Sequence, residues 1–142
     1  EIELRIPALL PEDYVPDVNM RLSFYKRIAS AENEEALKEL KVELIDRFGL
    51  LPEATKNLFQ ITQIRHLAKT LGLKKIEAGI NGGFLEFKAT ATPDPMKFLQ
   101  LIQQDKTAYK FDGPLKFKFN KPLENNEVRL QFVSELMDTL TK

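Results

Sequence analysis

The clearest hydrophobic pattern in the chain lies between Asn33 and Pro52. Leucine and phenylalanine recur there at steps of three and four residues, which places them on one face of a helix. Asn33 suits the N-cap, and Glu34 and Glu35 follow in the first turn, where the helix dipole favours acids. Gly49 suits a left-handed C′ position and Pro52 cannot continue a helix. The pattern predicts an amphipathic helix with two marked ends.

The side of this helix opposite the apolar face is acidic. It carries four acids and one β-branched residue: Glu35, Glu39, Val42, Glu43 and Asp46. Like charges four residues apart on a helix repel by roughly 0.2–0.5 kcal/mol per pair, and an exposed valine interrupts a polar face. Charged residues opposite an apolar stripe are nevertheless what any surface helix carries. The residues alone leave two interpretations open, a solvent-exposed face and a docking surface.

Before this helix the pattern predicts a strand, a connection and a first helix. Glu1–Ile6 alternates apolar and charged residues with period two. Three prolines then favour an extended connection, and Pro16 suits the first helical position with Asp17 in the first turn. The expected apolar stripe of this first helix is Val18, Leu22, Tyr25 and Ala29.

A third helix is expected from Pro52 to Gly72. Its apolar residues again recur at helical spacing: Ala54, Leu58, Ile61, Ile64, Ala68 and Leu71. The one histidine, His66, falls beside this stripe, and we expect it at the edge of the helix or on the surface.

The second half of the chain predicts two hairpins and two helices. Asn81-Gly82-Gly83 favours a tight turn, because Asn-Gly supplies the positive φ angles that such a turn requires. Gly113-Pro114 marks the second turn. The expected strands are Lys74–Ile80, Phe84–Ala89, Ala108–Asp112 and Leu115–Phe119. A short helix after Asp94-Pro95 should bury Phe98, Leu99 and Ile102, and a final helix should bury Val128, Phe132, Val133, Leu136, Met137 and Leu140.

This order of elements predicts an α+β fold. It consists of an N-terminal strand, a three-helix segment, a small and mainly antiparallel sheet of two hairpins, and a C-terminal helix. A length of 142 residues corresponds to one domain, residues 1–142. Because the sequence lacks an initiator methionine and opens on a strand pattern, we expect a domain excised from a longer chain.

Candidate chemistry is sparse. The sequence has no cysteine and one histidine, which excludes disulfides and a His-pair zinc site. It contains no phosphate-binding glycine loop and no nucleophile-elbow pattern around Ser23, Ser30 or Ser134. No run of apolar residues approaches the roughly 20 that a membrane span needs. We therefore expect no catalytic, cofactor or metal residue in this chain.

Two charge concentrations remain. Residues 32–53 hold seven acids against three bases, and residues 97–122 hold six lysines against two acids. The basic stretch interleaves lysines with Tyr109, Phe111, Phe117 and Phe119, so a nucleic-acid surface over Lys97–Lys121 is the alternative function. The favoured interpretation is that these aromatics point inward and the lysines form a solvated outer side.

Two runs of residues resemble a known family. IPALLPEDYVPDVNMRLSFYKRIASA and ELKVELIDRFGLLPEA are similar to the carboxy-terminal domain of the bacterial transcription-repair coupling factors, and together they cover most of the first 54 positions. On this resemblance, the residues that define the fold are Arg21, Tyr25, Arg47, Phe48 and Gly49.

The resemblance implies a regulatory domain. The parent proteins are ATP-driven DNA translocases that act on stalled RNA polymerase and recruit the repair protein UvrA, with ATP and Mg²⁺ bound in motor domains outside this chain. Their carboxy-terminal domain packs on the N-terminal UvrA-binding module and masks it. Carried onto this sequence, the expected interface is Glu39, Val42, Glu43 and Asp46, the partner is intramolecular, no membrane is involved and the location is cytoplasmic.

Overall fold

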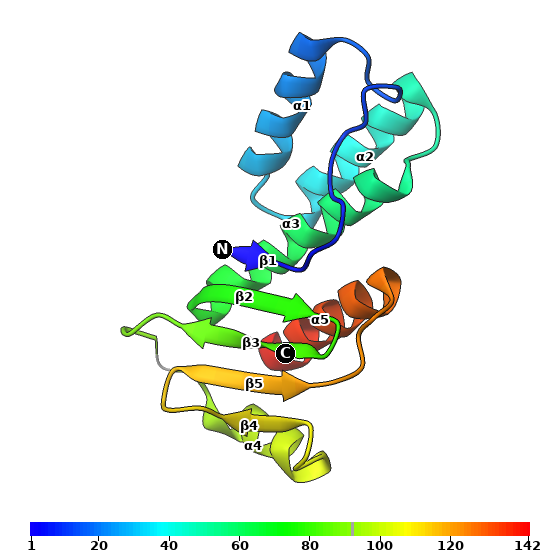
Figure 1. Cartoon of the computed structure of the whole chain (residues 1–142). Coiled ribbons are helices and arrows are strands. Elements are labelled where there is room, and N and C mark those ends of the chain that lie inside the picture. Colours follow the sequence, from blue (N-terminus) through cyan, green and yellow to red (C-terminus); the bar gives the residue numbers. More distant parts are fainter. Residues whose placement is uncertain (92) are drawn as a thin grey trace. The chain divides into compact units, whose positions relative to one another are not determined.

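The computed structural model describes residues 1–91 and 93–142, which pack as two compact units. Ile6–His66 form a helical unit, and Glu1–Arg5 with Leu67–Lys142 form a unit built on a sheet (Figure 1). The chain contains five helices and one five-stranded mixed sheet in the described residues, so the predicted α+β fold is confirmed. The assignment of residues 1–142 to one domain stays a prediction.

Three helices follow residues 7–16, which contain three prolines and which we call the proline-rich segment. Each helix begins next to a capping side chain or a proline. The helices are α1 (Val18–Ser30), α2 (Glu34–Phe48) and α3 (Glu53–Leu71). The last residues of α3, from Leu67 on, belong to the sheet unit. Asp17 is the N-cap of α1, because its carboxylate accepts the Met20 N–H at 2.9 Å. Pro16 therefore precedes the helix, and the expectation that it is the first helical residue was wrong.

The buried face of α1 also differs from the expected stripe. Phe24 and Ile28 are buried, whereas Val18 and Leu22 are exposed. The polar ends of Arg21 and Tyr25 bond to the backbone of the proline-rich segment, so this segment covers the side of α1 that carries them, and of the expected stripe that side includes Tyr25. Apolar residues lie on several sides of this helix, and spacing alone could not select the buried ones. The core of the helical unit is Leu10, Val15, Phe24, Ile28, Ala31, Leu37, Leu40, Leu44 and Phe59.

The proline-rich segment is held along α3 by buried polar side chains. Thr55 donates its hydroxyl hydrogen to the Leu9 carbonyl at 3.0 Å, and Asn57 donates to the Pro7 carbonyl at 2.9 Å. Both side chains are buried. The predicted stripe of α3 was correct for Ile64 and Ala68 but missed these two residues, because a hydrophobicity pattern cannot show which polar groups find backbone partners.

The sheet has the strand order β1-β2-β3-β5-β4. Its strands are β1 (Ile2–Glu3), β2 (Leu73–Gly79), β3 (Gly82–Phe87), β4 (Tyr109–Phe111) and β5 (Lys116–Asn120). β1 pairs in parallel with β2, and the other pairs are antiparallel. β1 is shorter than the predicted Glu1–Ile6, because Arg5 takes a positive φ of 58° and ends the extended run.

The first hairpin was predicted correctly, but its turn was not. The two residues between the strands are Ile80 and Asn81, and the positive φ belongs to Gly82, at 124°, rather than to Asn81. A Cβ on Gly83 would lie 1.8 Å from the Glu77 carbonyl oxygen, and one on Gly82 would lie 2.2 Å from that of Phe119. The two glycines therefore let β3 approach β2 and β5 closely.

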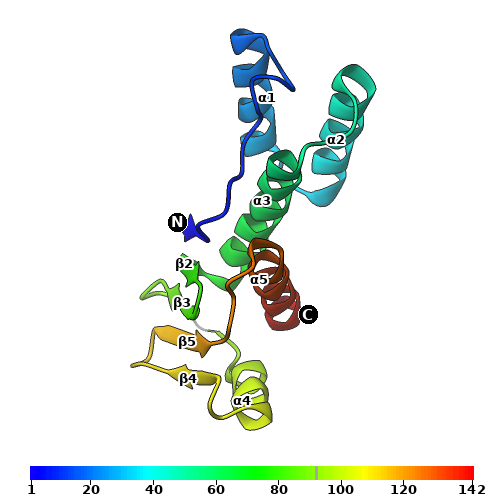
Figure 2. The same ribbon diagram turned by 45° about the vertical axis from the view of Figure 1, so that its right-hand side comes forward.

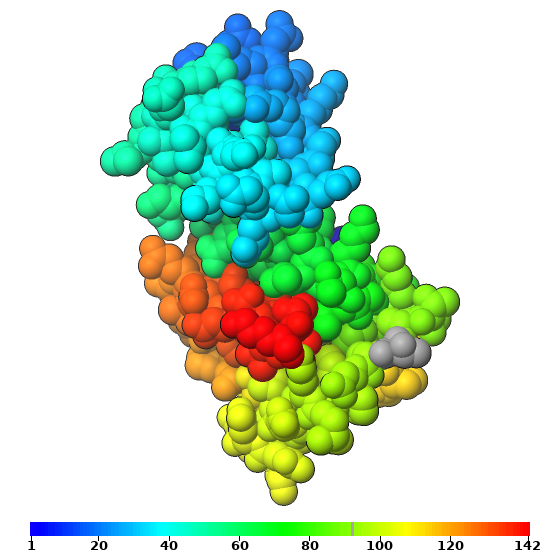
Figure 3. Space-filling view, turned by 180° about the vertical axis from the view of Figure 1, so that it is seen from behind, coloured from blue at the N-terminus to red at the C-terminus, as the bar shows by residue number. Residues whose placement is uncertain are grey.

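Two helices, α4 (Pro95–Gln104) and α5 (Asn126–Thr141), pack on one side of this sheet (Figure 2). Phe98 of α4 contacts the rings of Phe87 and Phe117. The predicted core positions Leu99 and Val128 were wrong, because both are exposed on the outer sides of their helices. The outer side of α5 lies on the molecular surface, visible in orange and red in Figure 3.

α5 instead buries a charged side chain, Arg129. Its guanidinium donates to five oxygen atoms in two segments of the chain, namely the carbonyls of Leu4, Arg5, Leu123 and Glu124 and the side chain of Asn126. Each buried donor is thereby satisfied, which removes most of the cost of burying an arginine. Arg129 thus joins the β1 segment to the start of α5 within the sheet unit.

Candidate interaction surface on helix α2

The ends of α2 are fixed by local contacts that the sequence predicted in part. Asn33 accepts the Ala36 N–H at 2.8 Å, which confirms it as the N-cap. Gly49 donates its N–H to the Ile45 carbonyl at 2.9 Å and has φ 94° and ψ −170°. This is not the left-handed helical conformation that we expected, but a region of φ and ψ that is essentially open to glycine alone.

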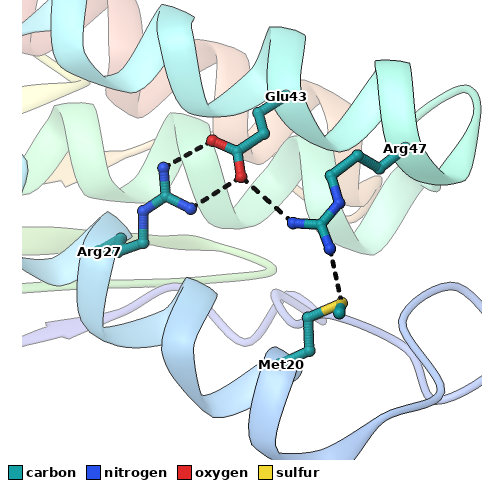
Figure 4. Close-up of polar contacts among 4 residues, drawn as sticks. All are labelled: Met20, Arg27, Glu43 and Arg47. Atoms are coloured by element: carbon teal, nitrogen blue, oxygen red, sulfur yellow. Dashed lines mark hydrogen bonds and ion pairs between the residues drawn. The ribbon is translucent and has the colours of Figure 1, made fainter.

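Glu43 lies on the side of α2 that faces α1. Its two carboxylate oxygens accept from the two guanidinium nitrogens of Arg27 at 2.6 and 2.9 Å, and Arg47 adds a third contact at 3.4 Å (Figure 4). The hydrogen bond from Arg27 is the main reason that the pKa of Glu43 lies below its ordinary value. The same bond raises the pKa of Arg27. Two cations therefore neutralise the Glu43 charge within the helical unit.

Both arginines rest on aromatic rings. The guanidinium carbon of Arg27 lies 5.1 Å from the centre of the Phe24 ring, and that of Arg47 lies 5.4 Å from the Phe48 ring. Arg47 also approaches the Met20 sulfur at 3.3 Å. Cation–π contacts of this kind hold an arginine fork in place, so the Glu43 carboxylate meets partners that are already oriented.

Exposed residues on one side of α2 form a separate strip, which we call the outer strip: Glu35, Lys38, Glu39, Val42, Ile45 and Asp46. Val42 is 60% exposed and Ile45 is 41% exposed, so two apolar side chains lie among three carboxylates and the ammonium of Lys38. Of the four residues predicted as an interface, three lie on this strip. Glu43 lies apart from them, between α2 and α1.

Sequence reasoning missed Arg27 and Ile45. Arg27 is 16 residues from Glu43, and no spacing rule connects positions on two different helices. Ile45 is one turn from Val42 and four residues before Gly49, and its helical position beside the acids could have identified it.

The five residues that the resemblance marks as fold-defining contact the proline-rich segment or the end of α2. Arg21 donates to the Val15 carbonyl at 2.8 Å, and the Tyr25 hydroxyl accepts the Leu10 N–H at 2.7 Å. Phe48 packs its ring against those of Tyr14 and Phe24, and the Gly49 carbonyl accepts the Tyr14 hydroxyl hydrogen at 2.7 Å. These contacts hold the connection and the end of α2 together, and the fold-defining role of these residues stays a prediction.

A nucleic-acid surface over Lys97–Lys121 stays a prediction, and the structure shows where the aromatics of this stretch lie. Tyr109, Phe117 and Phe119 are buried, which matches the inward-pointing interpretation, whereas Phe111 is 37% exposed although its ring contacts those of Phe98 and Phe117. His66 is half-buried on α3. In residues 1–91 and 93–142, no group of three or more His, Asp or Glu side chains is placed to hold a metal ion. No helix in this described part of the chain is both long and apolar enough to cross a bilayer.

Known proteins similar to this chain share both its sequence and its fold. The model of the TRCF domain matches residues 4–98, which is more than half of the chain. The chain belongs to the TRCF domain family. It is 63% identical over 140 residues to the transcription-repair-coupling factor of Haemophilus influenzae and 46% identical to that of Escherichia coli strain K12. Both alignments cover 99% of this chain and 12% of the relative, so the chain spans about an eighth of their length.

A solved structure carries the same fold. The crystal structure of a C-terminal domain of transcription-repair coupling factor superposes with a TM-score of 0.83 at 22% identity, covering 99% of this chain and 90% of that domain. The family that residues 6–54 resemble is therefore confirmed, and the shared fold extends over nearly all of the chain, including the sheet, where the quoted motifs do not reach.

Proposed function

We propose that this TRCF domain is a regulatory, autoinhibitory interaction domain. It packs by the outer strip of α2 on the N-terminal UvrA-binding module of the same protein, and it masks that module until the translocase engages stalled RNA polymerase. The observation that supports this proposal is the outer strip itself, where Val42 and Ile45 are exposed between Glu39 and Asp46. Three carboxylates against the single ammonium of Lys38 leave the strip with excess negative charge, and exposed apolar side chains in such a setting suit a basic partner.

The outer strip would act by apolar contact at its centre and by charge at its rim. Val42 and Ile45 lose exposed area on docking, while Glu39 and Asp46 accept charge-assisted hydrogen bonds from basic side chains of the partner module. Removing one member of a buried charge pair costs about 2–5 kcal/mol, whereas a rim charge changes mainly the association rate. Glu39 and Asp46 are both exposed in the free domain, so both acids are replaced in the test.

Glu43 has a different role in this proposal. Because it holds Arg27 and Arg47, it orients two cations beside the outer strip and cancels part of their charge. Loss of the Glu43 carboxylate would leave two uncompensated arginines on a surface that meets a basic partner. Glu43 would thus support the mask by reducing the positive charge of the two arginines.

The remaining partners and cofactors belong to the rest of the protein. We propose that ATP, Mg²⁺, DNA and RNA polymerase bind other domains of the coupling factor, and that this domain needs no cofactor and performs no reaction. On this proposal UvrA is its competitor rather than its ligand, and the protein acts in the cytoplasm on bacterial transcription-coupled repair.

The test is UvrA binding to the full-length coupling factor with Glu39→Ala and Asp46→Ala combined. Loss of the mask should raise UvrA affinity by about tenfold, equivalent to about 1.4 kcal/mol of weakened packing. Glu135→Ala with Asp138→Ala on α5 removes the same charge elsewhere and should leave UvrA affinity unchanged. If the outer-strip variant binds UvrA no more tightly than the wild type, the proposal is wrong.

A further inference from the structure

The sheet has one covered face and one open face. Residues that point toward α4 and α5 are buried, among them Ile76, Leu85 and Phe117. Side chains between them point the opposite way, and Figure 2 shows α4 and α5 on the covered side only. We call the outward side the open face, and its side chains on β2 to β5 include Lys75, Glu77, Phe84, Glu86, Lys110, Lys116 and Lys118.

Phe84 is the one aromatic residue of the open face in the described strands. It lies on β3 directly opposite Lys118 of β5, and it is half-buried. The ammonium of Lys116 lies 4.4 Å from the centre of the Phe84 ring. A large apolar ring on a solvent-facing sheet surface is unusual beside charged neighbours, and a cation over it shows that its π face is accessible.

Lysines gather on the β4–β5 side of this ring. Lys110 and Lys118 are directly opposite each other in the β4–β5 ladder, an arrangement that like charges disfavour. Lys118 also contacts Asp112 at 2.9 Å, and a hydrogen bond from Lys118, followed by attraction to it and to Lys116 and Lys110, lowers the pKa of Asp112. The Asp112 carboxylate is thus attracted by three lysines.

The acids of the open face lie on its other half. Glu77 contacts Lys75 at 3.8 Å, and Glu86 contacts Lys74 at 3.7 Å. The open face is therefore divided into a balanced half on β2 and β3 and a half on β4 and β5 with excess positive charge. Phe84 lies at the boundary between the two halves.

We propose that the open face binds single-stranded nucleic acid, with one base stacked on Phe84 and the backbone phosphates at the lysines of β4 and β5. An exposed aromatic ring beside lysines on a sheet is the arrangement by which single strands are bound without a sequence code. A stacked base contributes more than an exposed cation–π contact, so it displaces the Lys116 ammonium, which then reaches a phosphate. A duplex offers phosphates but no accessible base face, so it cannot make the first contact.

This site is distinct from the aromatics that the sequence suggested. Tyr109, Phe117 and Phe119 are in the core, and Phe111 packs on Phe98 and Phe117 at the edge of the covered face. Phe84 lies outside the Lys97–Lys121 stretch in the sequence and meets its lysines only through the β3–β5 pairing. The site lies in the sheet unit and uses no residue of the outer strip, so it does not depend on the proposed mask.

A tryptophan in place of Phe84 provides a direct measurement. The chain contains no tryptophan, so Phe84→Trp in the full 142-residue chain gives a single indole signal at the proposed stacking position. Titration with a single-stranded dT oligomer or rU oligomer of about 12 nucleotides should quench this fluorescence, and a duplex of the same length should not. The two single strands separate DNA from RNA, and binding of either supports the site.

Two further variants test the ring and the charges separately. Phe84→Leu keeps an apolar side chain without a π face and should weaken binding of the labelled oligomer about tenfold. Lys110→Ala with Lys118→Ala should lower the slope of log affinity against log salt by about 1.4, because each phosphate contact on a single strand contributes about 0.7. Lys97→Ala with Lys106→Ala removes equal charge from α4 and the turn after it, and should change the slope little.

Several results would overturn the proposal. An indole that stays unquenched at low salt contradicts stacking on Phe84, and so does a Phe84→Leu variant that binds the oligomer as tightly as the wild type. Equal binding of duplex and single strand contradicts it as well. An equal loss of the salt slope of affinity in the Lys97/Lys106 control contradicts phosphate binding at Lys110 and Lys118. Equal displacement of the oligomer by polyglutamate at matched charge would assign the lysines to an acidic peptide instead. Thermal melts of each variant by circular dichroism separate lost binding from lost folding.

Discussion

At the residue scale, Glu43 shows how a surface acid can be fixed inside one unit. It is about one-third exposed, yet it accepts three contacts from two arginines that rest on aromatic rings. Exposed ion pairs contribute roughly 0–1 kcal/mol, and a bidentate, pre-oriented arginine places this pair at the upper end of that range. The sequence placed Glu43 in an expected interface but could not identify Arg27 as its partner, because Arg27 lies on another helix.

Replacement of this acid gives a prediction with a defined pH dependence. Glu43→Gln should lower the free energy of unfolding by about 0.5–1 kcal/mol near pH 7, since the amide cannot form the bidentate charged pair. The folded-state pKa of Glu43 lies below its ordinary value of 4.5, so the stabilisation is complete above 4.5 and is lost as the pH falls through the folded value. Urea unfolding of both proteins should therefore converge in acid.

Glu39→Gln is the matched control for this measurement. Glu39 is exposed on the same helix, and its replacement should change the free energy of unfolding by less than about 0.5 kcal/mol at either pH. A constant difference between Glu43→Gln and wild type from neutral to acid pH would show that the charge of Glu43 does not stabilise the fold.

At the element scale, the parts of the fold that local chemistry determines could be predicted. Caps at Asn33 and Asp94 and the glycine after α2 located two helices correctly. Buried faces were harder to predict. The side of α1 that packs inward depends on where the proline-rich segment lies, and that in turn depends on Tyr25, Thr55 and Asn57 bonding to distant carbonyls. Such contacts have no periodicity in the sequence.

In the strands, too, local patterns could be predicted and contacts between distant segments could not. Hydrophobic alternation predicted both hairpins, but the short β1 follows from Arg5 at a positive φ, and the glycines of β3 have a role that turn rules did not supply. Asn-Gly predicted a turn by its backbone preference. The structure uses Gly83 because a side chain there would overlap the neighbouring strand.

Substitution of that glycine tests the close approach of the strands. Gly83→Ala would place a Cβ 1.8 Å from the Glu77 carbonyl oxygen, so β2 and β3 must separate, and we expect a loss of at least about 3 kcal/mol in the free energy of unfolding. Gly113→Ala is the control. Gly113 has φ 75° with open space around it, so only the backbone strain of about 1–2 kcal/mol should appear. Equal losses in chemical denaturation would exclude crowding at Gly83.

At the scale of the whole molecule, the two proposed activities lie in different compact units. The outer strip belongs to Ile6–His66, and Phe84 belongs to the unit with the sheet. The relatives align over 99% of the chain, so both units share one ancestry.

A double variant tests whether the two units act separately. Asp46→Ala should raise the affinity of the full-length protein for UvrA without changing oligomer binding. Phe84→Leu should weaken oligomer binding without changing the affinity for UvrA. Sites without shared partners combine additively within about 0.3–0.5 kcal/mol, so the double variant should show both single effects at nearly full size. The measurements are UvrA affinity and dT-oligomer affinity on the same four proteins. A coupling well above that range would mean that release of the mask and strand binding are one linked event, with the single strand acting as a signal for release.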